Sequence, residues 1–149
     1  MQDDKLEVKR VGWTNDRGQD LGEFRVILAG GYTHTNILTG MNEAGAHAAI
    51  ARIEGRSKLG VSNGWRWIVT ADDDGSAVVR EFADASRGDA SRPMVDVVVD
   101  GQTWHGANRL AEWHNYRLES HIKHEAAEAR HERMDNGAEC DAAGLYWEF

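Results

Sequence analysis

The sequence predicts an α+β fold, in which a mainly antiparallel sheet of about five strands carries one short helix and one long C-terminal helix packed on it. The first observation is the order of the segments: two strands, a helix, several strands and a last helix. The second is the pair Asp100 and Gly101, which is typical of a two-residue hairpin turn. We find no repeat and no linker, so we expect residues 1–149 to form a single globular domain.

The first two strands are expected at residues 5–13 and 23–29. In the first, the apolar positions change parity between Val8 and Val11, which predicts a bulge or an early bend. In the second, alternate residues form one apolar face while Ile27 lies on the other. This pattern indicates a strand that is partly covered on both faces.

A short helix is expected over residues 42–54, after a polar loop or short irregular strand at residues 32–40. Asn42 or Thr39 is suited to cap its first turn, because its side-chain oxygen can accept a bond from a free amide. Gly55 is expected to end the helix. The apolar stripe of this helix consists of Ala46, Ala49, Ile50 and Ile53.

Three further strands are expected at residues 65–69, 76–83 and 94–99, where apolar side chains alternate or β-branched residues gather. The Asp-Gly turn should return the chain through residues 102–104 as the second arm of a hairpin. Residues 84–93 are rich in small and polar side chains and are expected to form a mobile loop.

The last element is a long helix, expected over residues 108–135 and ended by Asn136 and Gly137. Its spacing predicts a buried stripe next to the arc of the histidines. The members of that stripe are Leu118, Ile122, Ala126 and Ala129.

Charge and composition argue against two classes of function. The net charge is −8, from 25 acidic and 17 basic residues, and residues 76–149 carry −6 of it. Nucleic-acid binders need a basic face, so we expect no direct binding of nucleic acid. The longest apolar run is far shorter than the about 20 residues of a membrane helix, and the first residues do not resemble a signal peptide. With Cys140 as the single cysteine, these features predict a cytoplasmic protein without an internal disulfide.

Histidines gather on one side of the long helix. At about 100° per residue, His114, His121, His124 and His131 fall within an arc of about 100°, together with Glu128. Carboxylate metal proteins use the Glu-x-x-His spacing of Glu128 and His131, but they surround the metal with matching helices. We therefore expect a solvated helical face and no metal or other cofactor. If a metal bound, its ligands would be His121, His124, Glu128 and His131, and a homodimer would supply the second helix. A pH-sensitive interface is the remaining alternative.

No motif for catalysis stands out. Residues 72–75 lack the ligand spacing of a calcium loop, and Cys140 lies between two acidic residues, which disfavours a reactive thiolate. A polar segment after the second strand, with Tyr32, His34 and Asn36, could form a small ligand loop. The sequence thus leans toward a protein that is not an enzyme.

The C-terminal part of the chain is the best candidate for an interaction surface. Most of the six tryptophans are expected to serve the core, but their number also favours one or two as interface anchors. Trp147 is the best candidate, because it lies in an aromatic tail that either docks on the domain or contacts a partner. The residues assigned to this surface are Glu112, Glu119, Glu125, Glu132, Trp147 and Phe149.

The function expected from these features is that of a non-catalytic acidic binding protein with a protein partner. One such partner is a basic nucleic-acid-binding protein, which it would inhibit, by analogy with small acidic phage inhibitors of host defences. The alternatives are a small enzyme or ligand-binding protein with its site near Tyr32, His34 and Asn36, and a structural subunit of a virion or other assembly.

Overall fold

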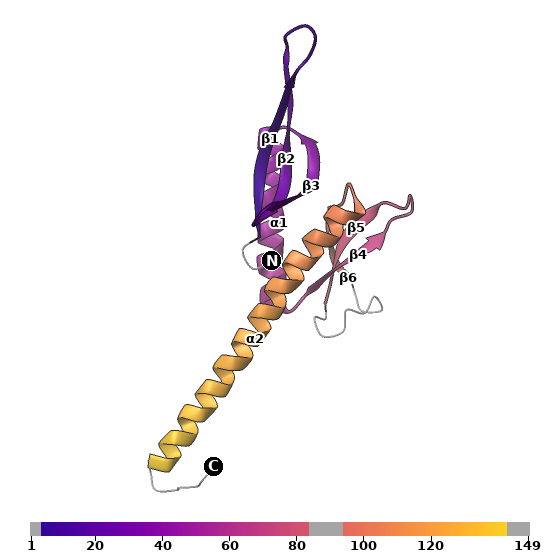
Figure 1. Cartoon of the computed structure of the whole chain (residues 1–149). Coiled ribbons are helices and arrows are strands. Elements are labelled where there is room, and N and C mark those ends of the chain that lie inside the picture. The colour runs from indigo at the N-terminus through magenta and orange to yellow at the C-terminus, as the bar shows by residue number, and fades with distance from the viewer. Residues whose placement is uncertain (1–3, 84–93, 143–149) are drawn as a thin grey trace. The chain divides into compact units, whose positions relative to one another are not determined.

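The chain divides into two compact units, Met1–Leu118 and Glu119–Phe149. A computed structural model describes the backbone of residues 4–83 and 94–142, and the side chains of residues 4–83 and 94–131 (Figure 1). The expected loop at residues 84–93 lies outside the described residues.

The fold is α+β with antiparallel strands, as predicted, but the described strands form two sheets of three instead of one sheet of about five. The first sheet contains β1 (Lys5–Thr14), β2 (Asp20–Gly30) and β3 (Thr33–Met41). The second contains β4 (Arg66–Ala71), β5 (Ala77–Phe82) and β6 (Met94–Asp100). The helices are α1 (Glu43–Asn63) and α2 (Trp104–Ala142). Strands that follow one another pair readily with each other, and the 21 residues of α1 interrupt the sequence of strands, which separates the two sheets.

Of the bulge or early bend predicted in the first strand, the bulge is wrong. The register between β1 and β2 runs without a shift from Lys5 opposite Ala29 to Thr14 opposite Asp20. The register shifts lie instead between β2 and β3, around Val26. The apolar residues of β1 change from one face to the other after Val8. The strand tolerates this change because neither face is buried in that part of β1.

Of the two alternatives predicted for residues 32–40, a polar loop or a short irregular strand, the structure shows a strand, β3. Its middle residues Ile37 and Leu38 are both buried, at 3% and 8% exposure, while the residues before them are mostly exposed. Gly31 supplies a left-handed turn with φ of 57° before the strand. The polar composition reflects one exposed half of a strand at the edge of its sheet.

Helix α1 starts as predicted but ends later. Asn42 caps it, with its side-chain oxygen accepting a bond of 2.6 Å from the amide of Gly45. The helix continues through Gly55 and ends at Gly64, whose φ of 76° provides the left-handed cap. A glycine within a helix costs only about 1 kcal/mol, and the turns after Gly55 bury Ser57, so packing offsets that cost.

The predicted hairpin after Asp100 is also wrong, because the chain enters α2 at Trp104. Gly101 does not adopt a positive φ, so a turn does not explain the glycine. Other parts of the chain lie too close for a side chain, because a Cβ there would lie 2.9 Å from the Cβ of Ala107 and 3.1 Å from the carbonyl oxygen of Ala77. The Thr103 hydroxyl then accepts a bond of 3.0 Å from the amide of Gly106 in the first turn of α2.

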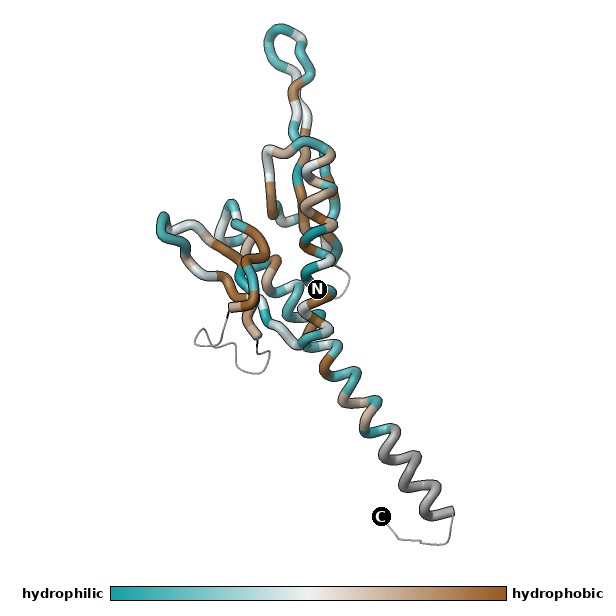
Figure 2. The backbone as a smooth tube through the Cα atoms, turned by 180° about the vertical axis from the view of Figure 1, so that it is seen from behind, coloured by the Kyte–Doolittle hydropathy of each residue, from teal (hydrophilic) through white to brown (hydrophobic). Residues whose placement is uncertain are grey.

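The core of unit 1 draws on both sheets, on α1 and on the first turns of α2. Figure 2 shows hydrophobic residues along the strands of both sheets. Trp67 and Trp113 are buried and lie 6.2 Å apart between ring centroids. Trp13 and Trp104, by contrast, are 50% and 44% exposed, so fewer tryptophans serve the core than the sequence suggests.

Helix α2 is longer than expected at both ends, and Asn136 and Gly137 lie inside it. Its predicted buried stripe holds only at Leu118, which is fully buried. Ile122 is 44% exposed, and Ala126 and Ala129 are exposed as well. Within the described residues, no helix is both long enough and apolar enough to cross a membrane.

Candidate functional site

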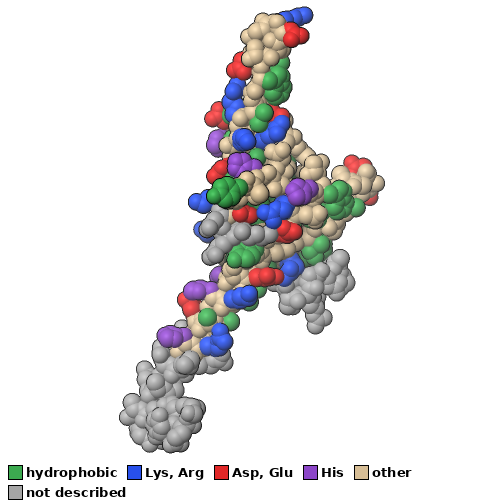
Figure 3. Space-filling model, viewed as in Figure 1, with side chains coloured by type: hydrophobic (Ala, Val, Ile, Leu, Met, Phe, Trp, Pro, Cys, Tyr) green, Lys and Arg blue, Asp and Glu red, His purple; other side chains and the backbone are tan. Residues whose placement is uncertain are grey.

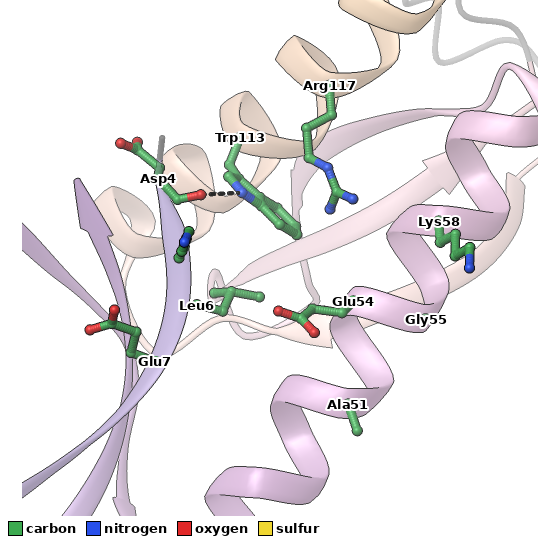
Figure 4. Close-up of a pocket in the computed structure, with 10 residues that line it drawn as sticks. Asp4, Leu6, Glu7, Ala51, Glu54, Gly55, Lys58, Trp113 and Arg117 are labelled. Atoms are coloured by element: carbon green, nitrogen blue, oxygen red, sulfur yellow. Dashed lines mark hydrogen bonds between the residues drawn. The ribbon is translucent and has the colours of Figure 1, made fainter. Parts of the chain in front are cut away.

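A groove of about 620 Å³ lies in unit 1 between the start of β1, the side of α1 and the side of α2 (Figure 4). Residues 4–7 form one wall, and Trp113 and Arg117 of α2 form another. The third wall comes from α1 and consists of Ala51, Glu54, Gly55 and Lys58. Cavities of about 300–1,000 Å³ are the usual size of ligand sites.

Hydrogen bonds and stacking fix the walls of this groove. The indole Nε1 of Trp113 donates to the carbonyl oxygen of Asp4 at 3.2 Å, which joins α2 to the chain just before β1. Arg109 pairs with the carboxylate of Asp4 at 3.2 Å. The guanidinium of Arg117 lies 4.7 Å from the centroid of the Trp113 ring, a favourable cation–π geometry. The groove therefore has a preformed aromatic wall.

A buried polar cluster connects α1, α2 and the second sheet behind this wall. His114 accepts at Nδ1 from the Ser57 hydroxyl, 2.8 Å away, and its Nε2 donates to the carbonyl oxygen of Trp65 at 2.9 Å. This assignment follows because only a protonated Nε2 can donate to a carbonyl. Burial lowers the pKa of His114 to about 4; the bond to Trp65 opposes this, and nearby arginines add to it. The imidazole is thus neutral near pH 7.

Ser57 and His114 have the residue types of a nucleophile and its base, but both are fully buried. The His114 ring stacks on Trp67 with centroids 4.0 Å apart, as core side chains do. The pair therefore holds the elements of unit 1 together in this structure. The sequence pattern had grouped His114 with an exposed face, and only its neighbours from other elements reveal its burial.

A fully buried carboxylate, Glu81, completes the cluster. It accepts from Arg56 at 2.9 Å and 2.5 Å and from the indole of Trp67 at 3.0 Å. Buried carboxylates persist only when they are paired in this way. Gly60 makes room for the cluster, since a Cβ there would lie 2.7 Å from Glu81 and 2.9 Å from His114. The sequence does not single out Arg56, Ser57 and Glu81, because no local motif marks them.

In unit 2, the described histidines lie on the surface of α2 (Figure 3). His121 and Glu125 form one pair, and His124 and Glu128 form another, each with 3.1 Å between Nε2 and Oε1. His131 lines a shallow hollow together with His124 and Glu128. Among the residues that the structure describes, no group of three or more histidine, cysteine or acidic side chains is placed to hold a metal ion.

The acidic residues assigned to the interaction surface do not share one face. Glu112 belongs to unit 1, where it pairs with Arg109 at 2.9 Å. In unit 2, Glu119 and Glu125 are exposed but lie about 120° apart around the helix, at about 100° per residue. Glu132 is at a position about 20° from Glu125, although its side chain lies outside the described residues, as do Trp147 and Phe149.

The polar segment after β2 forms an exposed turn and strand end. Tyr32 is fully exposed, and His34 and Asn36 are exposed residues of β3. The structure therefore places the three side chains near one another along the chain, on the surface. Comparison with known proteins finds no matching family model, no matching curated protein and no matching solved structure.

Proposed function

We propose that the protein is a non-catalytic binding protein, and that residues 119–142 of α2 recognise a basic surface of a protein partner. The observation that carries the proposal is the exposure of every described side chain from residue 122 to residue 131. These include Ile122, which is 44% exposed in a regular helical turn.

An unsupported helix gains from a partner. Isolated helices are marginal in water, because most helical stability in proteins comes from packing an apolar face. Ile122, Ala126 and Ala129 lie within about 60° of one another around the helix, so a partner that covers Ile122 also covers the two alanines. This is the pattern of helices that bind in a groove of another protein.

Charge favours a basic partner. Residues 119–142 contain seven acidic and three basic side chains, a net charge of −4 with the histidines neutral. The exposed pairs of His121 with Glu125 and of His124 with Glu128 border the apolar positions. Such a surface speeds the encounter with a basic protein and makes binding sensitive to salt. A basic nucleic-acid-binding protein is one partner of this kind, and occupation of its binding surface would inhibit it.

The test compares two charge reversals of equal size. Glu125→Lys with Glu132→Lys changes the proposed surface, and Asp16→Lys with Asp73→Lys makes the same change in exposed turns of unit 1. Proteins captured by the wild type are identified, and the affinity of the purified partner is measured at about 50 mM and 500 mM salt. We expect the first variant to bind at least about tenfold more weakly at low salt, a loss of about 1.4 kcal/mol, while the second binds as the wild type does. Equal binding by both variants would contradict the proposal.

A further inference from the structure

The outer parts of β1 and β2 and the turn between them, residues 8–26, form a hairpin arm that extends beyond the rest of the first sheet (Figure 1). In the described part of the chain, β3 pairs with β2 only as far as Phe24, which lies opposite Met41. The outer part of the arm therefore consists of two strands alone. Since two-stranded hairpins are marginally stable at best in water, a further strand along the arm would stabilise it.

The outer side of β1 is the open edge of this arm. Among the described residues, β1 has one neighbouring strand, β2, and no backbone bond from another element reaches residues 8–14. Trp13 is 50% exposed in this segment, and Leu21, its partner on β2, is 38% exposed. A strand that pairs with this edge would meet open backbone groups and cover an apolar side chain.

The charge of the arm favours a second copy of the chain as that strand. The arm contains four basic and three acidic residues, a net charge of +1 in a chain of −8, so two copies meet less repulsion here than at their acidic residues 119–142. Arg10 pairs with Asp20 at 2.9 Å, and Arg25 pairs with Glu23 at 2.8 Å. A strongly acidic or strongly basic partner therefore finds little charge to match on the arm.

The order of residues in β1 selects one register for this pairing. In a symmetric antiparallel pair, one residue lies opposite itself on the two-fold axis. Lys9 or Arg10 at the axis would place like charges opposite each other, which destabilises a sheet. With Val11 at the axis, Lys9 of each copy lies opposite Trp13 of the other, where a cation–π contact can form. This register also pairs the whole open edge, residues 8–14, with itself.

We propose that two copies of the chain join by antiparallel pairing of residues 8–14, with Val11 on the two-fold axis, so that the two arms become one four-stranded sheet. Trp13 of each copy packs against Lys9 and Val11 of the other, because diagonal neighbours on paired strands lie within reach of an aromatic side chain. The surface lies in unit 1 and does not depend on the partner of residues 119–142.

Sedimentation velocity of the full chain over about 1–200 µM tests the association, which must depend on concentration. The wild type should approach twice the monomer mass of 16.6 kDa. Val11→Lys places two like charges opposite each other at the axis and should weaken the dimer at least about tenfold. Leu21→Lys adds the same charge to the same face of the arm but on β2, away from the open edge, and should leave the dimer unchanged. Circular dichroism checks that both variants fold.

A disulfide trap in a Cys140→Ser background tests the register. Val11→Cys places two thiols at the axis, where the Cβ atoms of facing residues lie about 4.5–5.5 Å apart, close to the spacing of a disulfide. Thr14→Cys is the matched control, because its two copies would lie six residues apart along the paired strands, about 20 Å. Mild oxidation should crosslink the first variant and not the second.

Three results would overturn the proposal. The wild type could remain a monomer at about 200 µM, where a dimer of micromolar affinity would form. The Val11→Lys variant could associate as tightly as the Leu21→Lys variant, which would place the contact elsewhere. Thr14→Cys could crosslink as readily as Val11→Cys, which would exclude the register.

Discussion

Helix α2 contains two stretches with a similar spacing of apolar residues, of which the first is buried and the second is exposed. Up to Leu118, the helix buries apolar residues at helical spacing, with Leu110 and Leu118 at 0% exposure. After Leu118, the same spacing continues through Ile122 and Ala126, yet every described side chain from residue 122 is exposed. Periodicity therefore reports which side of a helix can be buried, and the other elements of the fold decide whether it is.

The largest expected effect separates these two stretches directly. Leu110→Ala removes a fully buried side chain from the core and should lower the free energy of unfolding by about 3 kcal/mol. Ile122→Ala removes an exposed one and should change it by less than about 0.5 kcal/mol. Urea denaturation of the two variants measures both values. A cost at Ile122 close to that at Leu110 would show that the second stretch is part of a core.

Acid should weaken unit 1 through His114. Its pKa is lowered to about 4 in the folded protein, from the value of 6.5 of an ordinary histidine, so the unfolded chain binds the proton more readily. The stabilisation from the neutral imidazole is complete above about pH 6.5 and is lost as the pH falls toward 4, by about 3 kcal/mol in total at about 1.4 kcal/mol per pKa unit.

Unfolding free energies measured between pH 7 and pH 4 check this slope. The control is His114→Gln, which should be less stable at pH 7 but should lose little of its remaining stability over the same range. An equal slope in the variant and the wild type would assign the pH dependence to other groups.

Two glycines of α1 allow the packed side of this helix to be compared with its open side by substitution. Gly60→Ala places a Cβ 2.7 Å from Glu81 and 2.9 Å from His114, and should cost about 1–3 kcal/mol. Gly55→Ala meets nothing within 4 Å and should stabilise the protein by about 0.5–1 kcal/mol. Thermal melting of both variants tests the pair. Destabilisation by Gly55→Ala would mean that the groove side of α1 is closed in solution.

Much of the fold could be predicted from local residue chemistry. Asn42, one of the two caps that the sequence predicts for α1, is the observed one, and Ile27 is covered on the second face of its strand as predicted, at 2% exposure. The pairing of strands could not be predicted in the same way, since alternation shows that a strand exists but does not name its neighbour. The hairpin predicted from the Asp-Gly pair at residues 100–101 is wrong for a related reason. The carbonyl oxygen of Ala77 lies close to Gly101, and Ala77 is too far away in the sequence for a local pattern to show this contact.

The groove was not predicted, because its walls come from distant parts of the chain. Asp4 and Trp113 are 109 residues apart and are joined by one hydrogen bond. Ser57 and His114 are 57 residues apart, so their burial is a property of tertiary packing alone. By contrast, the exposed His-Glu pairs of unit 2 lie four residues apart on one helix, and the sequence places them on a solvated face as the structure does.

Native-state hydrogen exchange along α2 tests most directly whether its second stretch is an exposed binding segment. The amides of residues 107–118 should exchange only when unit 1 unfolds, whereas those of residues 119–131 should exchange through local opening with far less protection. Addition of the captured partner should then protect residues 119–131 and leave residues 107–118 unchanged. Strong protection of both stretches in the protein alone would contradict this view, as would a partner that protects only residues outside 119–142.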